Sequence, residues 1–317
     1  MDAESYRNVG GVWLHKAFRE ENVRSAIQYK PREGDIFIVT YPKCGTNWVQ
    51  FIVYNILTRV KPLPSLREFG LLSPFIDMIG AKAAENPSRN GPIMTHLPPN
   101  VLQPVKGCKY IYVTRNPYDC AVSFYHFIKG FTLKTVTDVS FESFLALFLS
   151  GKVIYGDYFD HLLPWYKRRA DENVLFLTYE QLKQDTRGHV LKIADFLDEA
   201  LFQRILDACS LESMKAFFKD SPGERIKEIC KAATEVSLTS TEPLNRDPQR
   251  NVDKHEGSGF QTNSSDGSAR TRTALLVEPA PEPLGASGSG DMSGFSWKRL
   301  VESLGDMSLF EKLPLFQ

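Results

Sequence analysis

Apolar residues along the chain fall into two patterns, short β-branched runs and longer stretches of helical period. The short runs predict buried parallel strands, because strands covered on both faces are almost continuously apolar. We place them at residues 34–40, 92–99, 108–117 and 173–182, the last of which enters a helix. The longer stretches predict helices over residues 48–58, 119–130, 141–151 and 186–197. Strands alternating with helices indicate an α/β fold, a parallel β-sheet with helices on both faces.

The composition changes after about residue 220. Residues 237–294 are rich in Ser, Thr, Gly, Pro and Asn, and such a stretch cannot bury enough apolar area to fold alone. Apolar positions near 296–310 fit one short amphipathic helix. We therefore divide the chain into a domain over 1–220 that holds the functional site and an atypical, largely low-complexity region over 221–317.

The overall charge limits the partners that the protein can bind. The 317 residues carry 38 Lys plus Arg and 38 Asp plus Glu, so any anion site must be local and no nucleic-acid partner is expected. The five cysteines form no C-x-x-C pair and are read as free thiols of a reducing compartment. Neither a signal segment nor an apolar run of membrane-spanning length occurs, which predicts a cytoplasmic protein without a membrane partner.

The sequence TYPKCGTNW over residues 40–48 joins the first predicted strand to a helix. A loop at a helix N-terminus offers free N–H groups and a positive dipole end, to which Lys43 adds a charge and Gly45 a close backbone approach. Thr46 and Asn47 can donate further hydrogen bonds, and neither the loop nor the helix contains Asp or Glu. The alternative is a plain turn with a surface lysine. A P-loop kinase or ATPase would need the lysine after the second glycine and a carboxylate for magnesium, and the sequence has neither arrangement.

The predicted strands bring four polar side chains to the edge of the sheet where ligands bind: Lys43, His96, Arg115 and Tyr179. Arg115 can bind a phosphate through two hydrogen bonds, and Ser123 lies about two helical turns further on. Pairing of Arg115 with Asp119 is the alternative. His96 can accept a proton near neutral pH, unless it is a buried histidine with satisfied hydrogen bonds. No histidine or cysteine spacing suits a metal, so we expect no metal site.

These segments resemble the cytosolic sulfotransferase family in motif, order and spacing over about residues 10–218. TYPKCGTNW resembles the family's 5′-phosphosulfate loop, THLP its catalytic-histidine strand, and TRNPYDCAVSFYHF its 3′-phosphate strand and helix. LTYEQLKQDTRG resembles the family's L-x-Y-E-[DE]-[ML] segment. The resemblance implies the P-loop-like sulfotransferase fold and a PAPS-dependent enzyme, PAPS being 3′-phosphoadenosine 5′-phosphosulfate. It also implies that no metal takes part.

The resemblance assigns a role to each matching residue. It implies 5′-phosphosulfate contacts from Lys43, Cys44, Gly45, Thr46 and Asn47. It implies 3′-phosphate contacts from Arg115 and Ser123, adenine contacts from Trp48 and Tyr179, and a later cofactor segment with Ser210 and Met214. His96 would take the proton of an acceptor, while Lys43 would stabilise charge on the leaving group. The implied acceptor is a small phenol, catecholamine or steroid-like molecule, beside Phe75, Met94 and Phe127.

The sequence departs from the family pattern in three places. Met94 stands where the family usually has a lysine two residues before the histidine. The late F-x-R-K-G-x-x-G-D-W loop, which closes on the 3′-phosphate in the family, is not found, and GERIKEICK offers Arg225 and Lys227 in a helix-like context instead. The usual family dimer motif is not found either. The alternative function is therefore a catalytically impaired relative that binds a nucleotide or a protein partner.

Overall fold

A computed structural model of the protein describes residues 6–130, 139–199, 203–219 and 222–239. The helix predicted near 296–310 and nearly all of the low-complexity stretch lie outside these residues. Within the described part of the chain, no helix is long and apolar enough to cross a membrane. The same residues contain no group of three or more His, Cys, Asp or Glu side chains that could hold a metal ion.

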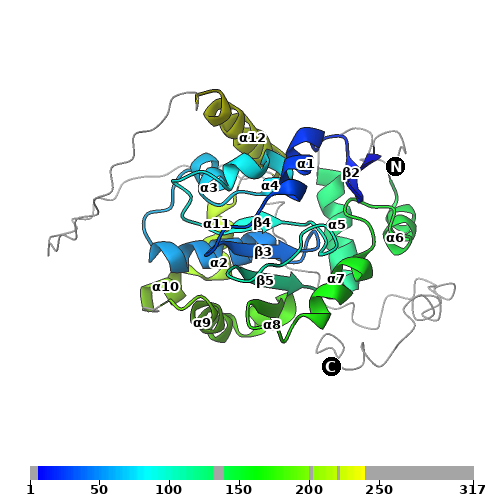
Figure 1. The fold of residues 1–317 in the computed structure, drawn as a ribbon. Helices are drawn as coiled ribbons and strands as arrows, with labels where there is room; N and C mark the ends of the chain where they lie inside the picture. The colour runs from blue at the N-terminus through cyan, green and yellow to red at the C-terminus, as the bar shows by residue number, and fades with distance from the viewer. Residues whose placement is uncertain (1–5, 131–138, 200–202, 220–221, 240–317) are drawn as a thin grey trace, which may run out of the picture.

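A four-stranded parallel sheet forms the centre of the molecule, with the strand order β4–β3–β5–β6. Its strands are β3 (Ile36–Thr40), β4 (Ile93–Thr95), β5 (Lys109–Thr114) and β6 (Val174–Thr178). Their carboxyl ends lie at one edge of the sheet, beside α5 and α7 in Figure 1. The predicted α/β sheet is thus confirmed, although β4 covers only three residues near the start of the run predicted at 92–99.

Helices cover both faces of this sheet, and a two-stranded hairpin precedes it (Figure 1). The predicted helices are present as α2 (Thr46–Thr58), α5 (Pro117–Gly130), α6 (Phe141–Leu149) and α9 (Thr186–Phe196). The other elements are β1 (Tyr6–Val9), β2 (Val12–His15), α1 (Glu20–Gln28), α3 (Leu66–Leu72), α4 (Ile76–Ile79), η2 (Ala81–Ala83), α7 (Tyr158–Lys167), α8 (Tyr179–Gln184), α10 (Gln203–Ala208), α11 (Leu211–Phe217) and α12 (Pro222–Thr239).

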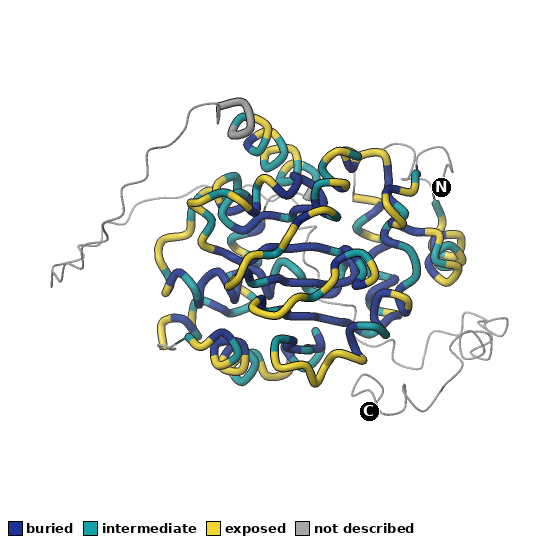
Figure 2. Tube along the Cα trace, viewed as in Figure 1, coloured by how far each residue is buried: buried dark blue, intermediate teal, exposed yellow. Residues whose placement is uncertain are grey.

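The strands are buried on both faces, as their continuous apolar runs predict (Figure 2). Phe37 and Val39 belong to one apolar cluster together with helices α1, α4, α5 and α7. Ile38, which alternates with them, belongs to a second cluster with α2, α9 and α11. The helix α12 begins beyond the boundary predicted at residue 220, and four of its apolar side chains pack against the first cluster. The division of the chain into two regions at residue 220 stays a prediction.

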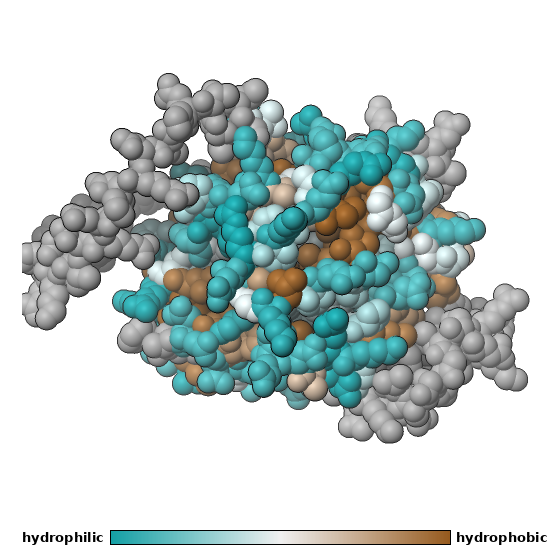
Figure 3. Space-filling view, viewed as in Figure 1, coloured by the Kyte–Doolittle hydropathy of each residue, from teal (hydrophilic) through white to brown (hydrophobic). Residues whose placement is uncertain are grey.

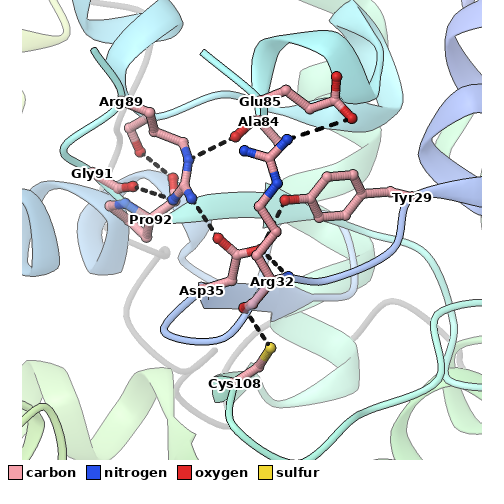
Figure 4. A network of polar contacts seen from close by, with 10 residues as sticks. Tyr29, Arg32, Asp35, Ala84, Glu85, Arg89, Gly91, Pro92 and Cys108 are labelled. Atoms are coloured by element: carbon pink, nitrogen blue, oxygen red, sulfur yellow. Dashed lines mark hydrogen bonds and ion pairs between the residues drawn. The ribbon is translucent and has the colours of Figure 1, made fainter. Parts of the chain in front are cut away.

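A buried ion pair fastens the end of the sheet that lies opposite the predicted site (Figure 4). Asp35 is 2% exposed and precedes β3, and its carboxylate accepts hydrogen bonds from the Tyr29 hydroxyl at 2.7 Å and the Arg32 amide at 2.8 Å. The Arg89 guanidinium pairs with the same carboxylate and donates to the carbonyls of Ala84 and Gly91. Arg89 thereby ties the loop before β4 to the start of β3.

We expect the substitution Arg89→Met to lower the free energy of unfolding by about 2 kcal/mol, because the buried Asp35 carboxylate loses its cation. The surface pair of Arg24 and Glu20 provides the control. Arg24→Met should change stability by about 0.5 kcal/mol or less, as usual for an exposed pair. Urea unfolding of both variants measures the difference. Equal stability of Arg89→Met and the wild type would contradict the structural role.

Candidate active site

The loop after β3 has the backbone geometry of an anion-binding turn. Lys43 and Gly45 both adopt positive φ, at 71° and 101°. A Cβ atom on Gly45 would lie 2.9 Å from Cδ2 of Tyr179, so this position requires glycine for conformation and for space. Helix α2 starts at Thr46 and, within the described chain, no side chain caps its first turn. Its first amide groups are therefore directed toward the carboxyl edge of the sheet.

The Lys43 ammonium lies in this half-buried turn, with its Nζ 4.4 Å from the centre of the Phe127 ring. Burial, and after it the positive charges of Arg225 and Arg115, lowers the pKa of Lys43 to about 8. Two of these cations, Lys43 and Arg115, lie together at this turn. Like charges in a partly buried site are unfavourable unless an anion joins them.

Arg115 follows β5 and is only 6% exposed. Its Nη1 donates to the Lys43 carbonyl at 3.3 Å, and its guanidinium carbon lies 4.5 Å from the centre of the Tyr179 ring. The hydroxyl of Tyr158 donates to the Arg115 carbonyl at 2.5 Å and fixes the backbone from the core side. Among the described residues, the buried Nε of Arg115 has no hydrogen-bond partner, and no ion pair joins Arg115 to Asp119. A buried cation with an unsatisfied donor is suited to an oxyanion ligand.

His96 follows β4 with its ring fixed in one tautomer. Its Nδ1 lies 2.7 Å from the Thr40 carbonyl oxygen, and because this oxygen can only accept, Nδ1 carries the proton. The second nitrogen, Nε2, is then the basic one. Nδ1 also lies 3.1 Å from the Thr40 hydroxyl, which is 2.7 Å from the Thr46 hydroxyl. Burial lowers the pKa of His96 to about 4, so the ring is neutral at physiological pH.

Asp77 holds the backbone that carries His96. Its buried carboxylate accepts from the Thr95 hydroxyl at 2.6 Å, the His96 amide at 2.8 Å and the Tyr155 hydroxyl at 2.9 Å. Burial raises the pKa of Asp77 to about 6, against these three hydrogen bonds. On the other side, Nε2 of His161 donates to the His96 carbonyl at 3.1 Å, and its Nδ1 accepts from the Tyr112 hydroxyl. The strand end is therefore held at both its amide and its carbonyl group.

The residues predicted to contact an acceptor lie around His96 and Lys43. The Phe75 ring centre is 4.9 Å from that of His96, and Phe75 forms a parallel bridge with Met94. Phe127 lies under the Lys43 ammonium. Figure 3 shows apolar side chains gathered beside α5 on this face of the molecule. The structure thus brings the predicted base, the predicted anion-binding lysine and an apolar wall together.

The remaining predicted residues lie in three places. Trp48 and Ser210 line a pocket of about 470 Å³ next to α9 and α10, and Trp48 packs edge-on against Tyr179 at 5.8 Å between ring centres. Ser123 is half-buried on α5. The side chains of Cys44 and Met214 instead point into the core, where the Cys44 sulfur lies 3.8 Å from that of Cys120. These two can serve a ligand only through their backbone or by packing.

Sequence reasoning did not find the residues that support the site. Asp77 is the one charged side chain in the apolar run LLSPFIDMIG, and a lone carboxylate in such a run was the available signal. His161 stands in a helix among large apolar residues, and only the fold shows that it contacts the His96 carbonyl. Tyr155 adopts a positive φ of 69°, which no sequence pattern indicated.

A cationic turn and a neutral histidine at the carboxyl edge of a parallel sheet fit one class of protein, α/β enzymes that act on an anionic donor. A family model described as a sulfotransferase domain matches residues 33–246. The chain therefore belongs to the sulfotransferase family.

Individual relatives agree with this assignment. The chain is 34% identical to sulfotransferase 1E1 of Homo sapiens over 229 residues, which is 67% of this chain and 76% of that protein. The crystal structure of mouse sulfotransferase SULT7A1 complexed with PAP is 31% identical and covers 67% of this chain and 76% of its own, with a TM-score of 0.54. A retinol dehydratase structure, 20% identical with a TM-score of 0.58 over 75% of this chain and 89% of its own, shows the same fold. PAP is the form that PAPS takes after transfer. The predictions of the sulfotransferase fold and of a PAPS-dependent enzyme are confirmed.

Proposed function

We propose that this chain transfers the sulfuryl group of PAPS to a hydroxyl or amine of a small apolar acceptor. The observation that carries the proposal is the His96 tautomer, because the bond from Nδ1 to the Thr40 carbonyl leaves Nε2 as a base. The contact of the His96 ring with Phe75 and the effect of the Lys43 charge on the pKa of His96 support this role. A neutral imidazole beside apolar rings is suited to taking a proton from a bound acceptor.

Each polar residue then has one task. Nε2 of His96 accepts the acceptor proton as the new bond to sulfur forms. Lys43 stabilises the negative charge that appears on the phosphate oxygen when the old bond to sulfur breaks, which is charge stabilisation in a preorganised site. The unsatisfied Nε of Arg115 supports a role on the 3′-phosphate, together with Ser123. Gly45, Thr46 and Asn47 would hold the 5′ end through the first turn of α2.

The wall formed by Phe75, Met94 and Phe127 supports an apolar, ring-containing acceptor of the phenol, catecholamine or steroid-like classes. Transfer of ³⁵S from labelled PAPS to one acceptor of each class tests the proposal. We expect labelled product with at least one of them. Tight binding of PAP without transfer to any phenol, catecholamine or steroid would replace the proposal by the catalytically impaired alternative.

The lowered pKa of Lys43 predicts how PAP binding depends on pH. The phosphates of PAP are fully ionised above about pH 7, so Lys43 is the group that changes. Below about pH 8 the Lys43 ammonium is charged and binds the anion. Above the pKa that Lys43 has in the ligand-free protein, the neutral amine must first take up a proton. The association constant should therefore fall by up to about tenfold per pH unit above that value. Titration calorimetry from neutral to alkaline pH measures this. Lys43→Met should remove the dependence, and an unchanged slope in that variant would contradict the assignment.

A further inference from the structure

Tyr155, in the loop between α6 and α7, adopts a backbone conformation that residues with a side chain rarely take. Its φ is 69°, and the following Gly156 is also left-handed, with a φ of 77°. This region costs a residue with a Cβ atom free energy, so the conformation persists only where surrounding contacts impose it, and such residues gather at functional sites. Two hydrogen bonds hold the backbone here. The Tyr155 amide donates to the Trp13 carbonyl at 2.8 Å, and the Gly156 amide donates to the Val153 carbonyl at 2.9 Å.

The Tyr155 hydroxyl is directed to the carboxylate that holds the backbone of His96. It donates to Oδ2 of Asp77 at 2.9 Å, and the same oxygen accepts from the His96 amide at 2.8 Å. The other carboxylate oxygen accepts from the Thr95 hydroxyl at 2.6 Å. Burial raises the pKa of Tyr155 well above its ordinary value, so the hydroxyl keeps its proton and remains a donor. One tyrosine hydroxyl thus fixes the carboxylate oxygen that holds the His96 amide.

The ring of Tyr155 contacts the His96 side chain directly. The two ring centres lie 5.1 Å apart with 80° between the planes, the edge-to-face arrangement that aromatic rings favour. Phe75 contacts the same imidazole, with 4.9 Å between ring centres and 64° between planes. The Tyr155 ring is itself supported by Phe18, at 5.8 Å and 89°. Tyr155 therefore supports one histidine at its ring and, through the carboxylate, at its backbone.

The segment of Tyr155 and Gly156 also bonds to the turn that follows β3. The Gly156 carbonyl accepts from the Tyr41 hydroxyl at 2.8 Å, and Tyr41 is a fully buried residue two positions before Lys43. The segment is thus bonded to the N-terminal hairpin, to Asp77 of α4 and to the turn that carries Lys43. It links the two parts of the site that lie on different strands of the sheet.

We infer that Tyr155 is a positioning residue for His96, which it orients by its ring and, through Asp77, by its hydroxyl. The inference rests on the proposed function for the role of His96 as the base. Tyr155 limits the rotation of the imidazole, so that Nε2 keeps one direction while it takes up the proton. Proton transfer needs the two heavy atoms within hydrogen-bond distance, so a base that is free to rotate loses rate even when every reacting group is present.

The substitution Tyr155→Phe tests the hydroxyl, and Tyr155→Leu tests the ring. We expect kcat to fall by about tenfold in Tyr155→Phe and about 100-fold in Tyr155→Leu, the scale of a small displacement of a catalytic group. The loss should fall on kcat, and the dissociation constant of PAP should stay within about twofold of the wild type. Phenylalanine should therefore recover part of the rate that leucine loses.

Tyr29→Phe is the matched control. The Tyr29 hydroxyl also donates to a buried aspartate, Asp35, at 2.7 Å, but at the opposite end of the sheet. This variant loses a comparable hydrogen bond, so its thermal midpoint should fall about as much as that of Tyr155→Phe. Its kcat should equal that of the wild type. The comparison separates a general loss of stability from a loss of orientation at the base.

A second readout needs neither donor nor acceptor. NMR correlation spectra of the imidazole nitrogens report which nitrogen of His96 carries the proton. The wild type and Tyr29→Phe should show the Nδ1–H tautomer alone, whereas Tyr155→Leu should show a mixture. Wild-type kcat in both Tyr155 variants, or an equal loss of kcat in Tyr29→Phe, would overturn the inference. If the wild type transferred no sulfuryl group, the proposed function would fail, and an unchanged tautomer in Tyr155→Leu would then overturn the inference separately.

Discussion

Lys43→Met should lower kcat by roughly 1000-fold at saturating donor, the scale of losing one preorganised charge from a transition state. At about 1.4 kcal/mol for each factor of ten, this corresponds to about 4 kcal/mol of transition-state stabilisation. The physical reason is the position of the ammonium in the turn before α2, where burial strengthens its interaction with the leaving phosphate. Methionine keeps most of the contact with the Phe127 ring, so the fold should survive.

The measurement is steady-state transfer with the donor concentration raised until the rate no longer increases. Lys61→Met is the matched control, because Lys61 is exposed in the chain after α2. It should retain wild-type kcat. A Lys43→Met enzyme that works within fivefold of the wild type under these conditions would remove Lys43 from the reaction step.

His96→Ala should lower kcat by about 100-fold to 10,000-fold, the range for loss of a general base. PAP affinity should barely change, because Nδ1 bonds to Thr40 and the proposed role of Nε2 is toward the acceptor. Since the pKa of His96 is about 4, the wild-type rate should not fall as the pH drops from 7 to 6, where an ordinary imidazole would become protonated.

His126→Ala serves as the control, since His126 is exposed on α5. Transfer rates and calorimetric PAP affinities of both variants are compared with the wild type. If His96→Ala instead weakened PAP binding strongly and kept its turnover, His96 would be a donor-binding residue and the assigned base would be wrong.

The sheet was predictable because its strands are buried on both faces and so read as unbroken apolar runs. The run predicted at 34–40 appears as Ile36–Thr40, and the run predicted at 108–117 appears as Lys109–Thr114, which ends three residues earlier than predicted. The hairpin of β1 and β2 was missed because its four-residue strands are too short to show a period, and Gly10 and Gly11 alone mark its turn. The local pattern of apolar residues therefore identifies the long buried strands of the central sheet but not the short strands of the hairpin.

The site was predictable where its residues follow strands, as Lys43, His96 and Arg115 do, because parallel strands share one ligand-binding edge. The packing of α12 was not predictable in the same way. The sequence indicated a helix around Arg225, but only the packing of Ile229 against Gly70 shows which face of that helix is covered. The hydrogen bond by which Asp77 holds the His96 amide likewise joins segments that are far apart in the sequence.

If His96 is the base and the turn before α2 holds the donor, the hydroxyl of Thr40 would link the two halves of the reaction. It lies 3.1 Å from Nδ1 of His96 and 2.7 Å from the hydroxyl of Thr46, so the Nδ1–H group, whose nearer acceptor is the Thr40 carbonyl, can share its hydrogen with a series of two hydroxyl groups. When Nε2 gains a proton, the imidazolium would polarise this series, and each link strengthens the next. The Thr46 hydroxyl would then become a better donor just as charge gathers on the leaving phosphate. Bond making at the acceptor and bond breaking at the donor would thus reinforce each other through the protein.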